Sequence, residues 1–160
     1  MSSVLKVDAI QNTAGTSAMT IDSSGRILTS ARPAFMARRT SLQSAGVIIF
    51  DTAMVNIGSH YNTSTGVFTA PVAGIYSFSP VVLSDTDGTD QFFVTAIRVN
   101  GSSYAQEQVH TDLDNDFCAS FTVIASLSAN DTVDVHTNYK IYGTSAATSN
   151  FTHFSGYLLG

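Results

Sequence analysis

The clearest pattern along this chain is an alternation of apolar and polar residues with a period of two. From Phe117 to Leu127 every second residue is apolar, and the positions between are mainly Ser, Thr and Cys. The run from Val133 to Tyr139 alternates in the same way. Alternation of this kind turns one face of a β-strand toward a core and the other toward solvent. Residues 117–127 and 133–139 are therefore predicted to be half-buried strands.

The residues between strands predict how the strands connect. Ser128-Ala129-Asn130-Asp131 separates the two runs and consists largely of turn-forming residues. We therefore expect the two runs to be antiparallel neighbours in one sheet. Asn100-Gly101 is a strong hairpin signal, because both residues tolerate positive φ.

Further strands are expected wherever similar apolar runs are bounded by turn residues. These runs lie at residues 33–39, 47–50, 66–70, 75–83, 91–99, 104–109 and 151–159. No segment has the three-and-four spacing of apolar residues that is typical of a helix. Short strands at this density predict an all-β fold, a β-sandwich of the jelly-roll type.

The first 31 residues differ from the rest. They contain short apolar groups separated by Asn, Thr, Ser and Gly, and no aromatic residue, whereas all ten Phe and six Tyr lie from Phe35 onward. Residues 1–31 are predicted to be a short β stem or attachment segment, and 32–160 a globular head. The junction falls at Arg32-Pro33, since proline favours an extended conformation in the residue before it.

Composition supports this interpretation and excludes several classes of protein. Hydrophobic residues make up 44% of the chain and charged residues 12%, which is too apolar for a disordered chain. The acids are eleven Asp and the single Glu107, and Asp is a residue of loops rather than of helix surfaces. Seven Lys plus Arg and a net charge of -5 exclude a nucleic-acid partner. No apolar run is long enough to predict membrane insertion.

Two predicted strands are apolar on both faces. Val47 to Phe50 and Phe92 to Val94 contain no polar residue. A two-layer sandwich buries one face of each sheet, so a second apolar face needs another cover. The simplest cover is another copy of the same chain.

Motifs spread over the predicted head resemble those of the globular heads of complement C1q and of the wider tumour-necrosis-factor-like jelly rolls. The resemblance covers most of residues 33–159. It rests on Pro33-Ala34-Phe35-Met36-Ala37, Asn56-Ile57-Gly58, Tyr61, Gly66-Val67-Phe68-Thr69-Ala70-Pro71, Gly74-Ile75-Tyr76-Ser77-Phe78, Val99-Asn100-Gly101, Leu127 with Asp131-Thr132-Val133, and Phe154-Ser155-Gly156-Tyr157-Leu158-Leu159.

The resemblance implies a ten-stranded jelly roll that assembles as a homotrimer. The aromatic residues of these motifs are then expected to build the structural and trimer core: Phe35, Phe68, Tyr76, Phe78, Phe154 and Tyr157. The chain departs from many members of the family in having no collagen-like Gly-X-Y repeat before the head.

The amino-terminal segment resembles one met in tail-fibre and other virion proteins of tailed bacteriophages. The residues that carry this shorter resemblance are 4–12, 16–22 and 23–28. It implies a small trimeric β stem, with apolar positions facing the threefold axis, that also attaches the head to other virion proteins. The localisation it implies is the virion, as an external appendage or on the capsid surface, after assembly in the bacterial host cytoplasm.

Two loops are dense in carboxylates and are the candidate metal sites. The calcium candidates are Asp85, Asp87 and Asp90 in the first loop and Asp112, Asp114 and Asp116 in the second. Alternating carboxylates can converge on one hard cation, which takes six to eight oxygen ligands. Neither loop has the complete twelve-residue pattern with a closing Glu, so solvated loop acids remain the alternative.

No motif predicts an enzyme. The four histidines lack the close pairing of zinc ligands, and no Gly-x-Ser-x-Gly elbow is present. A single Glu argues against a glycosidase pair. Cys118 is expected to be an ordinary free thiol, because no second cysteine exists to pair with it.

Three functions remain open at this stage. The first is a non-enzymatic trimeric virion protein, as fibre tip, tail appendage or head decoration, that binds a glycan or protein of the host cell surface. The second is an extracellular C1q-like recognition module unconnected with virions. The third is a purely structural decoration or plug that binds no host ligand.

Overall fold

The protein consists of two compact units, Met1–Arg32 and Pro33–Gly160, and each is described by itself. The computed structural model describes residues 6–29, 31–85, 91–111, 116–143 and 151–160. These ranges contain strands, turns and loops but no helix, as the alternating pattern predicts.

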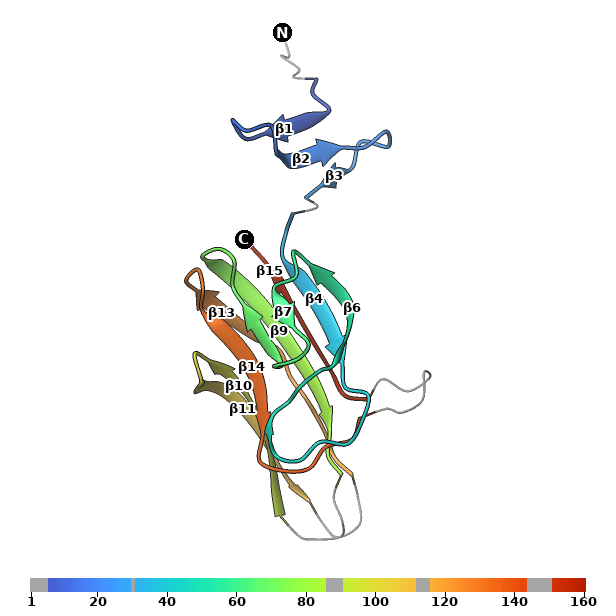
Figure 1. Ribbon diagram of the computed structural model, residues 1–160, viewed down its shortest axis with the longest axis vertical. Helices are drawn as coiled ribbons and strands as arrows, with labels where there is room; N and C mark the ends of the chain where they lie inside the picture. Colours follow the sequence, from blue (N-terminus) through green and yellow to red (C-terminus); the bar gives the residue numbers. More distant parts are fainter. Residues whose placement is uncertain (1–5, 30, 86–90, 112–115, 144–150) are drawn as a thin grey trace. The chain divides into compact units, whose positions relative to one another are not determined.

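The head, unit Pro33–Gly160, is a sandwich of two six-stranded sheets (Figure 1). One sheet has the order β12-β9-β15-β4-β6, with β13 also paired to β9. Its strands are β4 (Ala34–Arg38), β6 (Thr52–Ile57), β9 (Gly74–Leu83), β12 (Cys118–Ser120), β13 (Val123–Leu127) and β15 (His153–Leu158). All pairings in this sheet are antiparallel, so one face can pack on a core while the other stays open.

The second sheet has the order β11-β10-β14-β8-β7, with β5 paired to β14. Its strands are β5 (Gly46–Val47), β7 (Tyr61–Asn62), β8 (Val67–Thr69), β10 (Gln91–Val99), β11 (Ser102–Thr111) and β14 (Thr132–Thr137). The hairpin signal at Asn100-Gly101 is confirmed: these residues join β10 to β11 with φ of 50° and 77°. The architecture is the all-β jelly-roll sandwich that the sequence predicts.

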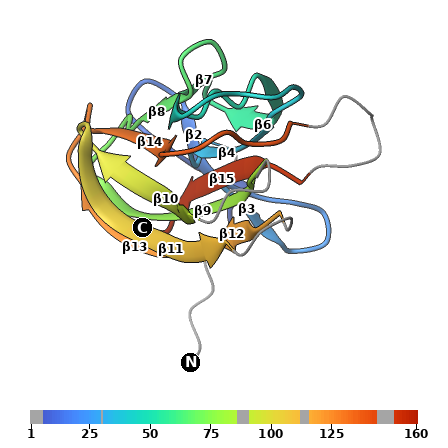
Figure 2. The same ribbon diagram turned by 90° about the horizontal axis from the view of Figure 1, so that it is seen from below.

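Aromatic rings fill the space between the sheets. Figure 2 shows β15 between β9 and β4 in one layer, with β10 and β14 belonging to the other. Phe35 of β4 stacks on Tyr61 at 4.7 Å and on Phe68 at 5.1 Å, which ties the two layers together. Phe154 meets Phe35 edge-on at 5.0 Å. Such ring pairs stabilise a core beyond the apolar area they bury.

Gly156 lies directly under this cluster. A Cβ at this position would come within 2.5 Å of the Phe78 ring and 2.7 Å of the Phe35 ring. We expect Gly156→Ala to lower the free energy of unfolding by about 1–3 kcal/mol through overpacking. Gly160→Ala is the matched control, since a Cβ there meets no atom within 4 Å. Urea unfolding of both variants measures the difference, and equal midpoints would contradict the packing described.

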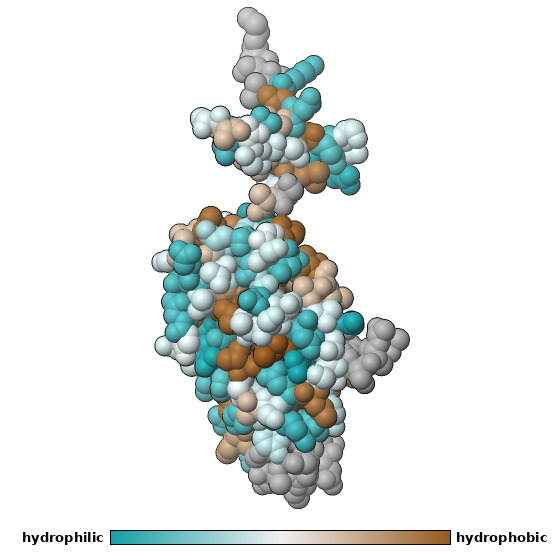
Figure 3. Space-filling view, viewed as in Figure 1, coloured by the Kyte–Doolittle hydropathy of each residue, from teal (hydrophilic) through white to brown (hydrophobic). Residues whose placement is uncertain are grey.

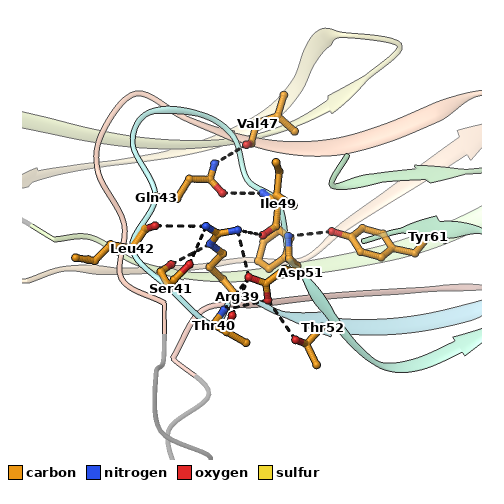
Figure 4. A network of polar contacts seen from close by, with 11 residues as sticks. Arg39, Thr40, Ser41, Leu42, Gln43, Val47, Ile49, Asp51, Thr52 and Tyr61 are labelled. Carbon is orange, nitrogen blue, oxygen red and sulfur yellow. Dashed lines mark hydrogen bonds and ion pairs between the residues drawn. The ribbon is translucent and has the colours of Figure 1, made fainter. Parts of the chain in front are cut away.

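The segment 47–50 is predicted to be a strand, but only its first residue, Val47, belongs to one. β5 ends at Val47, although Ile48 and Phe50 are fully buried. Its other backbone contacts are made mainly by side chains, as Figure 4 shows. The Gln43 amide donates to the Val47 carbonyl and accepts from the Ile49 amide, and the Tyr61 hydroxyl accepts from the Phe50 amide. Buried apolar residues therefore occur here without a regular ladder.

Arg39 completes the network of Figure 4. Its guanidinium donates to the carbonyls of Ser41, Leu42 and Ile49 and lies 3.3 Å from the Asp51 carboxylate. Asp51 in turn accepts from the backbone and hydroxyl of Thr40. Satisfied polar groups of this kind fix the long connection between β4 and β6 in one conformation.

The predicted pairing of runs 117–127 and 133–139 is wrong. The first run forms β12 and β13, which both pair with β9, whereas β14 pairs with β10, β8 and β5 in the opposite sheet. Asn130 adopts φ of 73°, and the Asp131 carboxylate accepts from the Ser128 amide, so the turn chemistry is present. The turn crosses between layers because both strands direct their apolar residues into the same core.

The amino-terminal unit is a three-stranded antiparallel sheet of β1 (Ala9–Gln11), β2 (Ser17–Ile21) and β3 (Ile27–Leu28). Its two turns are built alike. The Asn12 side chain accepts from the amides of Ala14 and Thr16, and the Asp22 side chain accepts from those of Ser24 and Arg26. Gly15 and Gly25 take φ of 81° and 78°. The same turn thus recurs after ten residues, which the sequence analysis did not predict.

Candidate functional site: an apolar face of the head

The open face of the β9 sheet carries an apolar row across five strands. Cross-strand pairing places Ile57, Ala34, Tyr157, Ser77 and Ile124 side by side, from β6 through β4, β15 and β9 to β13. Ile124 is 60% exposed, Tyr157 49% and Ile57 41%, although all are large and apolar in body. We call Ile57, Ala34, Tyr157 and Ile124, together with the small Ser77 between the last two, the apolar row; Ser77 is itself only 6% exposed.

The strands force these side chains outward. In β15, Phe154 and Gly156 are buried while Tyr157 is exposed, and in β4 Phe35 is buried while Ala34 is only half-buried. Since successive side chains of a strand point to opposite faces, the residues that fill the core also fix the apolar row on the other side. The strand sequences therefore determine the core face and the open face of this sheet together.

Neighbouring residues extend the apolar row into a patch. Val55 and Met36 lie opposite each other in the next row, and Ile75 and Leu159 flank the row at the end of β9. Val55, Ile75 and Leu159 are all exposed. Contiguous exposed apolar patches are rare on monomers and mark interaction surfaces. Figure 3 shows one face of the molecule, on which apolar residues lie among the hydrophilic residues of the head.

Polar residues take over further along the same face. His153 pairs with Arg38 on one side and Val81 on the other, and Ser120 follows Val81. The Ser79 and Thr122 hydroxyls share a hydrogen bond of 2.8 Å. Three cross-strand rows make up this face: the apolar row, the row that contains Val55 and Met36, and the row that contains Arg38 and His153. Arg38 is the one Lys, Arg, Asp or Glu among their residues, so the face is nearly neutral.

The structure places the predicted core aromatics on two sides of the sheet. Phe35, Phe68, Tyr76, Phe78 and Phe154 are buried between the layers. Tyr157 is not in the core of the domain, because its strand position points it to the open face. Sequence reasoning missed Ile57 and Ile124 as its partners, since their proximity depends on the register of five strands.

Of the six predicted calcium ligands, Asp85 and Asp116 are among the described residues. Asp87, Asp90, Asp112 and Asp114 lie outside the described residues. Asp85 is buried, and its carboxylate lies 3.0 Å from the Lys140 ammonium. The hydrogen bond from the Tyr142 hydroxyl to this carboxylate raises the pKa of Tyr142, and the charges of Asp116 and Asp85 raise it further. Within the described ranges no three His, Cys, Asp or Glu residues form a group that could hold a metal ion.

Cys118 is exposed on the outer face of β12. Partial burial, reinforced by the nearby Glu107 carboxylate, raises the pKa of its thiol. We expect Cys118 to react with iodoacetamide more slowly at pH 7.5 than a free cysteine does, because only the thiolate is nucleophilic. Glu107→Gln should accelerate the reaction by removing the charge. The rate followed against pH tests this, and an unshifted or lowered midpoint would contradict it.

Comparison with known proteins agrees with the fold. The family model of the C1q domain matches residues 34–159, and the chain belongs to this family. Its structure is similar to that of the globular domain of zebrafish complement 1qA protein, with 16% identity, a TM-score of 0.63, and coverage of 80% of this chain and 98% of the other.

Two tumour-necrosis-factor-like structures are similar as well. Murine APRIL has 10% identity and a TM-score of 0.64, with 80% of this chain and 99% of the other covered. Eiger TNF from S. frugiperda has 12% identity and a TM-score of 0.59, with 81% and 94% covered. Domains of this class are generally non-enzymatic recognition modules and commonly form homotrimers. The described ranges contain no helix of the length and apolar character that spans a membrane.

Proposed function

We propose that this chain is a non-enzymatic homotrimeric structural protein of a bacteriophage virion, whose C1q-like head binds the host cell surface. The observation that carries the proposal is the apolar row on the open face of the β9 sheet. In a monomer the exposed side chain of Ile124 stabilises nothing. Burying it against another subunit would contribute roughly 25 cal/mol per Å² of apolar surface to the free energy of association.

The near-neutral character of this face favours identical partners. Subunits that meet through aliphatic and aromatic side chains need no opposite charges, whereas a nucleic acid would need a basic surface that the net charge of -5 does not provide. Three copies around one axis would cover the apolar row of each by its neighbour. This cover also fits a chain in which only 12% of the residues are charged, about half the usual share.

The amino-terminal unit supports a place in a virion. Its residues 4–28 carry the resemblance to fibre segments of tailed phages, and within them β1, β2 and β3 form one small sheet. This unit would attach the trimer to other virion proteins, with the head outermost as fibre tip, tail appendage or head decoration. Three heads on one stem, repeated over the virion, would turn weak contacts with a host glycan or protein into firm attachment through avidity.

The proposal is tested in two steps with the full chain. Size-exclusion chromatography with light scattering should give three times the 16.9 kDa mass of the chain, and a monomer mass would contradict the trimer. Purified protein should then bind host cells and compete with phage adsorption. A trimer that does neither would favour a purely structural decoration or plug. Binding to extracellular targets together with a gene neighbourhood free of capsid and tail genes would favour a recognition module outside virions.

Calcium binding by the two Asp loops remains a prediction. The test is isothermal titration of the chelator-treated full chain with calcium chloride, compared with a variant in which Asp112, Asp114 and Asp116 are changed to Asn. If the second loop holds calcium, heat of binding is seen for the parent chain and is reduced in the variant. Titration of the parent without heat would remove calcium from the proposal.

A further inference from the structure

The sheet opposite the apolar row carries an exposed aromatic ring on its outer face. Phe92 is 53% exposed on β10, whereas its neighbour Phe93 is fully buried between the layers. His110 is the cross-strand partner of Phe92 on the neighbouring strand β11 (Figure 2), and its ring meets the Phe92 ring edge-on with the centroids 4.7 Å apart. The Phe92 ring is thus held in place on a regular strand while about half of the residue is open to solvent.

Two amide side chains continue this face along β11. Gln106 and Gln108 alternate with His110, so all three point to the same side of the sheet, and all three are exposed. The cross-strand partners of the two glutamines are an alanine and a valine, whose side chains offer no group for hydrogen bonding. Gln106 accepts a long hydrogen bond, of 3.5 Å, from the Ser103 hydroxyl. Because an amide both donates and accepts, both glutamines keep hydrogen-bonding capacity for a ligand.

The charged residues further along the same face neutralise each other. Arg98 of β10 donates two hydrogen bonds to the Asp134 carboxylate of β14, at 2.7 and 3.1 Å. Asp134 is only 6% exposed, so little of its charge reaches solvent. The described cross-strand rows between this pair and Phe92 contain no Lys, Arg, Asp or Glu on the outer face. The face therefore lacks the concentration of charge that an ionic ligand requires.

We propose that this face binds a neutral oligosaccharide, and we call Phe92, Gln106, Gln108 and His110 the glycan face. The inference rests on the proposed binding of the host surface, for which it specifies the ligand class and the place. The C–H face of a sugar ring packs on an aromatic ring, while sugar hydroxyls exchange hydrogen bonds with amides. Positions 106 to 110 span about 13 Å along β11, which is longer than a single sugar ring.

A protein partner fits this face less well. The centre of a protein–protein contact is typically apolar, whereas the exposed residues beside Phe92 on β11 are two amides and an imidazole. The glycan face also lies on the sheet opposite the apolar row, so subunits that cover the apolar row leave it open. A trimer would then present three glycan faces, which is the condition for avidity.

Host cells are the probe for this inference, because they carry the ligand whatever its order of sugars. Binding of the labelled full chain is measured to untreated cells, to cells oxidised with periodate, which cleaves the vicinal diols of sugars, and to cells treated with a proteinase. We expect periodate to abolish binding and the proteinase to leave it unchanged. Raising NaCl from about 0.1 to about 0.5 M should not weaken binding of a neutral ligand, since salt screens only charges.

Variants locate the binding on the glycan face. Phe92→Ala removes the ring, and Gln106→Ala combined with Gln108→Ala removes the two amides. We expect each variant to weaken cell binding roughly tenfold or more while keeping the mass and the unfolding midpoint of the parent chain. Phe151→Ala is the matched control: it removes a ring that is 54% exposed and lies outside the glycan face, and it should bind like the parent chain.

The outcomes separate this inference from the proposed function. Cell binding that survives periodate, that falls steeply with salt, or that is equal in Phe92→Ala and Phe151→Ala overturns the glycan face and leaves host binding by the trimer standing. A parent chain that does not bind host cells contradicts the proposed function. In that case, binding of the parent chain but not of Phe92→Ala to neutral polysaccharides on a bacterial glycan array would still support the glycan face, and its absence would overturn it.

Discussion

Replacing Phe154 with Ala is expected to lower the free energy of unfolding by about 3–5 kcal/mol, the largest effect of a single substitution in the head. Phe154 is fully buried on the central strand β15. Its ring contacts Phe35, Phe50, Tyr61 and Phe78 at centroid distances of 5.0, 5.6, 6.3 and 6.0 Å. Removing it leaves a cavity bounded by both sheets, and rigid ring neighbours cannot collapse to fill it. Chemical unfolding followed by near-ultraviolet circular dichroism measures the loss.

Phe151→Ala is the matched control for this experiment. It removes the same ring three residues earlier in the chain, where the side chain is 54% exposed. Surface substitutions of this kind usually change stability by less than about 0.5 kcal/mol. If the two variants unfolded at the same denaturant concentration, Phe154 could not be in the core described above.

A second large effect is expected for assembly rather than for folding. Tyr157→Asp places a carboxylate in the middle of the apolar row, at a side chain 49% exposed in the single subunit. If neighbouring subunits bury this row, each uncompensated charge costs about 3–5 kcal/mol, and the cost is incurred three times per trimer. We expect light scattering at micromolar concentration to give monomers, with an unfolding midpoint close to that of a single folded head.

Phe92→Asp controls for the introduction of a charge at an exposed aromatic position. Phe92 lies on β10 of the sheet opposite the apolar row, and its neighbour Phe93 is the one that enters the core. The apolar row therefore replaces Phe92, which the sequence analysis expected another copy to cover, as the proposed contact between subunits. This variant is expected to keep the mass of the parent protein. A trimer that persists in Tyr157→Asp, or that is lost equally in Phe92→Asp, would show that the apolar row is not the contact between subunits.

Local pattern was enough to predict most strands of the head. The long strands β9 and β10 are dense in β-forming residues, and β9, β10, β11 and β15 each lie where the sequence predicts a strand. The strand β6 was missed because its Ala53, Met54 and Val55 are all exposed, so no buried face marks it as a strand. The opposite error occurred just before it, where buried residues Ile48 and Phe50 belong to a loop held by side chains.

Contacts between distant segments were harder to predict. The crossing from β13 to β14 looks like a hairpin in sequence, because both hairpins and layer crossings use Asn, Asp and positive φ. The apolar row was difficult to predict for the same reason, because its residues come from distant segments. Tyr157 was singled out by its motif, but Ile57 and Ile124 become its neighbours only through four successive strand pairings. Register of this kind is set by packing of the whole sandwich, which no single segment encodes.

The repeated turn of the amino-terminal unit bears on how such a protein changes its length. Each turn is closed by its own Asn or Asp side chain and its own glycine, and takes nothing from the rest of the chain. One period of ten residues therefore contains a strand together with the means to reverse it. Duplication or loss of one decapeptide would extend or shorten the sheet by one strand without altering the head, so the reach of the protein can evolve independently of its binding surface.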